Sequence, residues 1–317
     1  MKLTSLIKKL IIKLKLNTVY NKNLISPNWY IFNLEQQTLP TIIKKKPKIL
    51  FYFDNVEYMH LGDHVFFLPV VKLLQDNNLS VSVKPTKIMR EFFINLGFKI
   101  IDGDVNFADY DLIISRVELI EQLQTYPTIL IDVAKNLTKP ICSELVTSFS
   151  QYFKLDNYYQ EIDYTRHFNN ISSVDKYQLP TKKLILFNLY CDASRYLITK
   201  QKRQLLLTKL KQYSNNDEYQ LVLVGSKTDK LQDKTHYDFS FIDLRGKTSV
   251  VDIFQLVAHA NTTYYIGFDA FIMHVFSLNK KTSFVVFRGR ISQSQSEMLK
   301  KYHVNLFDND NYVNLLN

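Results

Sequence analysis

Three short stretches of the sequence carry residue types whose spacing could support chemistry. The first is Leu61-Gly62-Asp63-His64, which is followed by Pro69. Gly62 permits a tight turn, and the carboxylate of Asp63 can either cap the following helix or act as a base. A cap of this kind stabilises a helix by about 1 kcal/mol. The spacing alone favours the cap, so the residues by themselves leave both roles open.

The second stretch runs from Asp243 to Ser249 and contains Gly246-Lys247-Thr248. Gly246 permits a turn, and Ser249 is a suitable cap for the helix expected from Val250. Free backbone amides at such a turn can bind an anion or a nucleotide. The same residues also suit a simple joint between a strand and a helix.

The third stretch is Gly267-Phe268-Asp269-Ala270-Phe271-Ile272-Met273-His274, where a strand ends and a helix begins. The start of a helix carries partial positive charge and suits a diphosphate. Asp269 could instead hold a sugar hydroxyl. His274, one turn into the helix, either packs in the core or donates a hydrogen bond to a phosphate.

The elements that must position these stretches alternate between apolar strand patterns and helical patterns. In the first half, strands are expected at 49–53, 79–83, 98–101, 112–115 and 128–133, with helices at 64–75 and 87–96. After an irregular segment, 155–182, strands are expected at 184–188, 221–224, 263–266 and 284–287, with helices at 199–213, 250–260, 271–278 and 292–301. Such alternation predicts parallel βαβ units in two α/β halves, with ligands at the carboxyl ends of the strands and a cleft between the halves.

The domain division expected from this pattern has three parts. Residues 1–48 form a basic N-terminal segment, 49–180 a first Rossmann-like domain with its linker, and 181–317 a second Rossmann-like domain. In residues 1–17 the leucines and isoleucines gather on one side of a helix and most lysines lie off it. This amphipathic pattern suits an anionic membrane surface, or a helix that packs on the protein.

Composition excludes several classes of protein. Two cysteines, Cys142 and Cys191, are too few for a disulfide scaffold or a four-thiolate zinc site. No apolar run reaches the roughly 18 residues that span a bilayer, and no signal peptide is recognised, so a cytoplasmic protein is expected. The net charge of +10 suits a nucleic acid, a membrane surface or a phosphorylated ligand. The 7 glycines do not form a GxGxxG or phosphate-loop motif.

In their order and spacing, the three stretches resemble glycosyltransferase family 9, the ADP-heptose:lipopolysaccharide heptosyltransferases. That family has Gly-Asp with Pro six residues after the Asp, later Gly-Lys-Thr/Ser-Ser, and then Gly-x-Asp-Ser/Thr-Gly-x-x-His. The matching residues here are Gly62-Asp63 with Pro69, Gly246-Lys247-Thr248-Ser249, and Gly267-Phe268-Asp269 with His274. Gly225 matches a further glycine of the family, and the resemblance covers residues 49–307.

The resemblance implies the glycosyltransferase B fold, with an N-terminal acceptor domain and a C-terminal nucleotide-sugar domain. It further implies inverting transfer without a metal, in which Asp63 takes the proton of the acceptor hydroxyl. Acceptor contacts are then expected from His60, Gly62 and His64. A donor site, with an ADP-linked sugar as the expected donor, is implied at Arg195, Gly225, Gly246, Lys247, Thr248, Asp269, Ala270, Phe271, His274 and Arg288.

Some positions depart from the family pattern. Arg195 stands where the family has the lysine that binds the diphosphate, and Ala270-Phe271 replaces Ser/Thr-Gly. Phe271 is bulky enough to block the start of the helix, or to stack on a base or sugar.

From the resemblance and the basic N-terminal stretch, the expected partners are a nucleotide sugar, a glycan or glycolipid acceptor such as a lipopolysaccharide core, and a membrane surface.

Three other interpretations stand beside this one. The same fold could use another nucleotide sugar for a capsule, an O-antigen or a protein, or the chain could be a non-catalytic binding protein. Two Asp-x-Asp sequences, at Asp102 and at Asp308, are typical of metal-dependent transferases, but their Gly and Asn residues favour turns. No basic and aromatic spacing matches a nucleic-acid module, so nucleic acid is not an expected partner.

Overall fold

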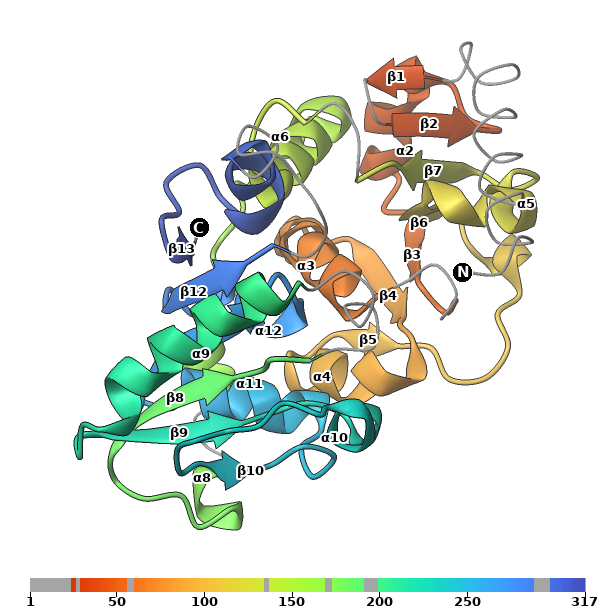
Figure 1. Cartoon of the computed structure of the whole chain (residues 1–317). Helices are drawn as coiled ribbons and strands as arrows, with labels where there is room; N and C mark the ends of the chain where they lie inside the picture. The colour runs from red at the N-terminus through yellow and green to blue at the C-terminus, as the bar shows by residue number, and fades with distance from the viewer. Residues whose placement is uncertain are drawn as a thin grey trace. The chain divides into compact units, whose positions relative to one another are not determined.

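The structure is a computed structural model that describes residues 24–26, 29–55, 60–133, 137–168, 173–190, 199–287 and 297–316. The contacts divide the chain into two compact units, both drawn in Figure 1. Unit 1 contains residues 1–138 and 144–161, and unit 2 contains residues 139–143 and 162–317. Each unit is an α/β layer structure built on a largely parallel sheet, which confirms the expected fold class.

Unit 1 is built on a seven-stranded sheet whose order is β1-β2-β7-β6-β3-β4-β5. Its parallel strands are β3 (Lys48–Tyr52), β4 (Ser80–Lys84), β5 (Lys99–Ile100), β6 (Leu112–Arg116) and β7 (Thr128–Ile131). Two antiparallel strands, β1 (Leu24–Ser26) and β2 (Trp29–Phe32), extend it at one edge. These two strands lie within the N-terminal segment that the sequence pattern kept apart from the sheet.

Helices cover both faces of this sheet. They are α2 (Leu39–Lys44), α3 (Leu61–Asp76), α4 (Arg90–Asn95), α5 (Ile120–Leu123) and α6 (Ile141–Phe153), with short 3-10 turns at Gln36–Thr38, Lys87–Met89, Phe107–Asp109 and Val117–Leu119. Side chains alternate along β3, so Phe51 packs against Phe67 of α3, with ring centroids 6.4 Å apart.

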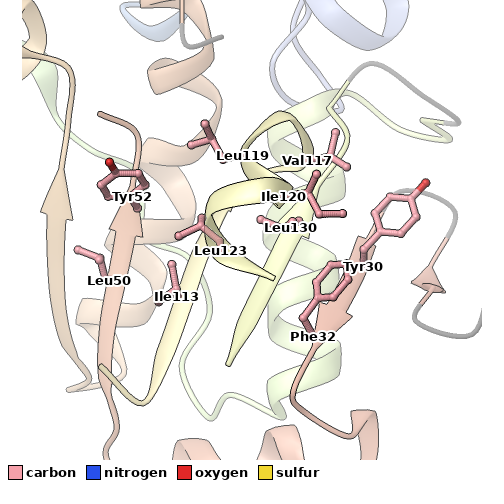
Figure 2. Packing of buried hydrophobic residues seen from close by; sticks show 10 residues of the cluster. All are labelled: Tyr30, Phe32, Leu50, Tyr52, Ile113, Val117, Leu119, Ile120, Leu123 and Leu130. Carbon is pink, nitrogen blue, oxygen red and sulfur yellow. The ribbon is translucent and has the colours of Figure 1, made fainter. Parts of the chain in front are cut away.

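The other face of the same sheet holds a continuous apolar cluster, shown in Figure 2. Leu50 and Tyr52 of β3, Ile113 of β6 and Leu130 of β7 project toward the turn and helix that follow β6. The cluster consists of Tyr30, Phe32, Leu50, Tyr52, Ile113, Val117, Leu119, Ile120, Leu123 and Leu130, all buried. This packing fixes the segment after β6 directly on the sheet, and that segment carries part of the site described below.

Unit 2 is built on a six-stranded sheet whose strands are all parallel, in the order β10-β9-β8-β11-β12-β13. The strands are β8 (Lys183–Phe187), β9 (Tyr219–Leu223), β10 (Ile242–Asp243), β11 (Thr262–Phe268), β12 (Thr282–Val286) and β13 (Val313–Leu315). Its helices are α7 (Tyr164–Phe168), α8 (Ser173–Lys176), α9 (Lys200–Ser214), α10 (Lys227–Gln232), α11 (Val250–Ala258) and α12 (Phe271–Leu278), with a π-helical turn at Lys300–Val304.

The observed elements differ from the expected ones mainly at short or edge positions. The long strands agree to within about two residues, whereas helix α3 begins at Leu61, three residues earlier than expected. Strands β10 and β13 and helices α6 and α10 were not expected from the pattern. The amphipathic stretch 1–17 and the loop residues Arg195 and Arg288 lie outside the described residues.

None of the helices in the described part of the chain combines the length and the hydropathy needed to cross a bilayer.

Candidate functional site

A topological switch point lies at the centre of the sheet in unit 1. The chain passes from β3 to β4 on one side and later returns to place β6 on the other side of β3. At such a point the connections leave in opposite directions, which opens a crevice outside the carboxyl ends of the two strands. Helix α3 is the first helix after β3, and β6 ends at Arg116, so both lie at this switch point.

Three charged side chains meet there, on segments far apart in sequence. Nη1 of Arg116 lies 2.5 Å from Oδ2 of Asp63, and the two side chains are only 9% and 12% exposed. The opposite edge of the guanidinium binds Glu118, with Nε donating to Oε2 at 3.0 Å and Nη2 donating to Oε1. Arg116 therefore joins the carboxylates of Asp63 and Glu118.

The two oxygens of Asp63 are in different situations. Oδ2 forms an ion pair with Arg116 and accepts a hydrogen bond from the backbone N–H of His60 at 2.8 Å. Within the described part of the chain, no hydrogen bond to Oδ1 is present. Asp63 is the third residue of α3 rather than its cap, which is His60. One oxygen of Asp63 therefore supports the helix start, and its role as a base stays a prediction.

The charges in this cluster do not balance. Burial lowers the pKa of Arg116, but the nearby carboxylates of Asp63, Glu118 and Asp132 more than offset that effect and raise it. Arg116 is therefore a permanent cation that faces three acidic side chains. A buried ion pair of this type costs several kcal/mol when one partner is removed, because the other charge is left uncompensated.

The histidines near Asp63 have separate roles. His64 is fully buried; its Nδ1 lies 3.0 Å from the carbonyl oxygen of His60, and its Nε2 accepts from the backbone N–H of Thr86 at 3.3 Å. Burial lowers the pKa of His64 to about 4, so it is neutral at pH 7. These contacts hold His64 in the core beside Asp63, and its contact with an acceptor stays a prediction. His60 is exposed and Gly62 half-buried, next to Asp63.

Unit 2 has its own switch point, between β8 and β11. Gly267 lies there because space is short: a Cβ at this position would be 2.3 Å from the hydroxyl of Tyr265 and 2.7 Å from the carbonyl oxygen of Asn188. The Tyr265 hydroxyl donates to the carbonyl oxygen of Phe268 at 3.1 Å. A glycine is therefore required for the end of β11 to approach the end of β8.

Helix α12 starts immediately after this glycine. Its cap, Ala270, forms no side-chain hydrogen bond with the helix, and no acidic residue occurs in the first turn. The ring of Phe271 packs edge-on against Phe254 of α11, with centroids 5.9 Å apart. This contact shows what the bulky residue touches, a point that the sequence left open. Asp269 and His274 are both half-buried on the same segment.

The stretch from Gly246 to Ser249 forms a joint between β10 and α11. Gly246 has φ +71°, and a Cβ there would lie 3.1 Å from the Cα of Lys227. Its N–H donates to the carbonyl oxygen of Gly225 at 2.8 Å, so this amide is already occupied. Ser249 caps α11 by accepting from the N–H of Asp252. Of the predicted donor residues here, Lys247 is exposed and Thr248 half-buried.

Charged and polar contacts also stabilise the first turn of α11. Burial raises the pKa of Asp252, but hydrogen bonds from Ser249, Lys176 and Tyr177 dominate and lower it to about 2. The Tyr177 hydroxyl lies 2.9 Å from Oδ2 of Asp252 and 2.8 Å from the carbonyl oxygen of Lys247. These contacts stabilise the joint between β10 and α11, and anion binding at this stretch stays a prediction.

Positive charge near the switch point of unit 2 comes from helix α9. Its first turn contains Lys200, Lys202 and Arg203, although cations are disfavoured at the start of a helix. Nζ of Lys202 donates to the carbonyl oxygen of Phe287 at 2.7 Å, at the carboxyl end of β12. The sequence analysis did not predict these residues. The cluster of basic residues in the first turn of a helix was the feature that could have indicated them.

Arg116 and Glu118 were also missed at the level of sequence. The available signal was an arginine at the end of a strand that is otherwise apolar, Leu-Ile-Ile-Ser-Arg, because a buried charge must find a partner. The two Asp-x-Asp sequences are engaged in local contacts: Asp102 pairs with Arg90, and Asp310 accepts from the N–H groups of Leu306 and Phe307. Over the described ranges, no three His, Cys, Asp or Glu side chains are grouped as a metal site would require.

Comparison with known proteins finds matches among solved structures but none by sequence. No protein-family model and no curated protein matches the sequence. A glycosyltransferase family 9 structure from Veillonella parvula superposes with a TM-score of 0.54 at 12% identity, covering 85% of each chain. E. coli ADP-heptose LPS heptosyltransferase II gives 0.53 at 12% identity, over 85% of this chain and 90% of that one. E. coli heptosyltransferase WaaC with ADP gives 0.54 at 11% identity, over 85% and 93%.

At these identities the likeness establishes the fold. The chain has the glycosyltransferase B fold, as the resemblance to family 9 implied.

Proposed function

We propose that this chain is an inverting glycosyltransferase that works without a metal, with Asp63 as its general base. The observation that carries the proposal is the position of Asp63 at the switch point of unit 1, with Oδ2 held by Arg116 and His60 and Oδ1 available. A carboxylate so placed can take the proton of an acceptor hydroxyl as that hydroxyl attacks the anomeric carbon of the donor.

Unit 2 binds the nucleotide diphosphate sugar in this proposal. Support comes from the glycine-tight switch point at Gly267, the uncapped start of α12 and the basic first turn of α9. A leaving diphosphate needs fixed positive charge where no metal supplies it. Lys202 is the described residue best placed for this, together with the predicted clamp Arg195. Asp269 would hold the sugar, and His274 would support the diphosphate.

The donor that we propose is an ADP-linked heptose, and the acceptor a bacterial surface glycan or glycolipid such as a lipopolysaccharide core. Two of the similar structures are named as heptosyltransferases, and one of them holds ADP. The motifs at Gly62-Asp63, Gly246 to Ser249 and Gly267 to His274 support the same assignment. A different nucleotide sugar on the same fold is the second candidate, favoured by the replacement of Ser/Thr-Gly by Ala270-Phe271.

The deciding experiment is a binding panel in the presence of EDTA. ADP-, GDP-, UDP-, CMP- and dTDP-linked sugars are compared by calorimetry with the full chain. Selective binding of an ADP sugar supports the heptosyltransferase proposal, and selectivity for another base replaces the donor while keeping the mechanism. Binding of none of them would overturn the proposal in favour of a non-catalytic protein. A requirement for Mn²⁺ would overturn the metal-independent mechanism.

The basic stretch 1–17 is proposed to bring the protein to anionic lipid. Deletion of residues 1–17 should reduce association with vesicles that contain anionic phospholipid, while the fluorescence of Trp29, the single tryptophan of the chain, keeps its folded spectrum. Unchanged association would mean that this segment packs on the protein instead.

A further inference from the structure

The environment of Asp63 contains more than a base requires. A carboxylate that takes a proton needs an accessible oxygen and a suitable affinity for that proton. Here the same carboxylate is also paired to the guanidinium of Arg116. Glu118 binds the other edge of the same guanidinium, so that one cation lies between two carboxylates.

The backbone beneath Arg116 is fixed by the sheet. Ser115 donates from its hydroxyl to the carbonyl oxygen of Tyr52 at 2.5 Å, which joins the ends of β6 and β3. The residues after Arg116 are held by Val117, Leu119 and Ile120 in the apolar cluster of Figure 2. The guanidinium therefore approaches Asp63 from a rigid support.

Glu118 determines how the guanidinium is directed. It occupies Nε and Nη2, so that Nη1 is the group that reaches Asp63. A planar guanidinium held along one edge has little freedom to rotate. Nη1 then lies beside Oδ2, which leaves Oδ1 as the oxygen for a substrate.

We propose that Arg116 and Glu118 form a positioning pair that aims the Asp63 carboxylate, with Oδ2 held and Oδ1 directed to the acceptor hydroxyl. Arg116 holds Asp63, and Glu118 holds Arg116. This inference rests on the proposed function for its catalytic meaning, but not for its geometry. The charged and titratable groups around Asp63 are Arg116 on β6, Glu118 in the turn after it, Asp132 after β7, and His60 and His64 beside Asp63 itself.

The test compares variants that keep or lose the held guanidinium. Glu118→Gln keeps one acceptor for the guanidinium but loses the charge-assisted bidentate pair, so kcat should fall about tenfold with the KM for the donor nearly unchanged. Arg116→Gln removes the guanidinium, so kcat should fall about a hundredfold, as expected when a reacting group is misplaced. Arg116→Lys keeps the charge but loses the fork, so its kcat should lie between those of Arg116→Gln and the natural chain.

Two readouts are compared in the full chain. The first is the carboxylate signal of Asp63 in ¹³C NMR of Asp-labelled protein at one fixed pH, with the signal assigned from its loss in Asp63→Asn. The second is kcat beside the KM for the donor, measured with the nucleotide sugar that binds best in the panel. The matched control is Arg90→Gln, which breaks a similar bidentate pair, Arg90–Asp102, on the exposed surface of the same unit. It should change neither readout.

A fall in kcat at nearly constant donor KM, together with a moved Asp63 signal, supports the proposal. An unchanged kcat in Arg116→Gln, or equal losses of kcat and donor affinity as general loosening would give, would overturn it. If Arg116→Gln fails to fold, Glu118→Gln and Arg116→Lys still decide the matter. A moved Asp63 signal without turnover of any nucleotide sugar would uphold the pair and overturn the proposed function instead.

Discussion

The two units share the same arrangement of strands but place different residues at its centre. In each sheet the first parallel strand of the βαβ series lies in the middle, the next strands extend to one side, and the chain then returns to the other side. Each sheet therefore has a switch point at the carboxyl ends of its central strands, where ligands of such sheets commonly bind. In unit 1 this point holds ionised side chains, Asp63, Arg116 and Glu118, on α3, on β6 and in the turn after β6.

In unit 2 the switch point is formed mainly by backbone groups. Gly267 lets β11 approach β8, and α12 begins three residues after the end of β11 with no side-chain cap. Of the residues at the two strand ends, 188–190 and 268–271, only Asp269 is charged. This difference agrees with the proposed roles of the two units. The switch point of unit 1 suits the movement of a proton, and that of unit 2 suits the binding of a polar ligand by fixed dipoles.

Removal of the base is the strongest way to break this comparison. Asp63→Asn keeps the shape and an acceptor for His60 and Arg116, but it cannot take a proton. Turnover should fall by about 10²–10⁴-fold, with donor affinity changed by less than about threefold. Single-turnover release of nucleotide from the donor measures the first quantity, and calorimetry measures the second. Retained turnover would reduce the charged network of unit 1 to a structural role.

The sequence predicted the parts of this comparison that depend on local patterns. Long apolar strands such as β3, β6 and β11 were found because runs of large apolar residues are bounded by polar ones. Asp63 and Gly267 were found because motif spacing singled them out. Two-residue strands such as β10 contain too few residues to show a period, and β2 is a short strand near the sheet edge, within a segment predicted to be separate.

The role of Arg116 could not be found in the same way. It is 53 positions from Asp63 (116 − 63), and the two meet only because β6 pairs with β3 in the register Leu112 to Ile49. Strand order in a sheet depends on long-range packing, which a local pattern does not contain. A charge at the end of an apolar strand shows that a partner exists, but not which one.

A second, smaller effect should separate the units by their response to acid. The pKa of His64 is lowered to about 4 by burial, against 6.5 for the ordinary group. The unfolded chain therefore binds a proton that folded unit 1 does not, so stability is full above about pH 6.5 and falls as the pH drops toward 4. At about 1.4 kcal/mol per pH unit, the loss from this group approaches roughly 3 kcal/mol.

Trp29 makes this effect measurable in unit 1, because it is the single tryptophan of the chain and is fully buried beside Phe149. Urea unfolding followed by Trp29 fluorescence between pH 7 and 4 should lose stability more steeply in the natural chain than in His64→Gln. His236→Gln, at an exposed position of unit 2, is the matched control and should keep the steep dependence. An equal slope in His64→Gln would show that the carboxylates alone control the acid response.

The smallest predicted effect contrasts two glycines, one in each unit. Gly97 has φ +78°, and a Cβ added there would have no atom within 4 Å, whereas Gly267 has no positive φ but would place a Cβ 2.3 Å from the Tyr265 hydroxyl. Gly97→Ala should therefore cost only backbone strain, about 1–2 kcal/mol of unit 1 stability, without change in donor binding. Gly267→Ala should cost about 1–3 kcal/mol through overpacking in unit 2.

The two substitutions should differ more in donor affinity than in their cost to stability. Tyr265 is fully buried and its hydroxyl is bonded to Phe268, so it cannot move aside without shifting the end of β11. That end leads directly into Asp269, Ala270 and the start of α12, and donor affinity should fall at least about tenfold in Gly267→Ala, as expected when overpacking displaces the backbone of a binding site. Trp29 fluorescence reports the unfolding of unit 1, and circular dichroism reports both units, so the part of the dichroism transition that departs from the Trp29 transition measures the cost in unit 2. If Gly267→Ala binds the donor as well as Gly97→Ala does, the close approach of β11 and β8 serves packing alone, and the ligand site of unit 2 must lie elsewhere.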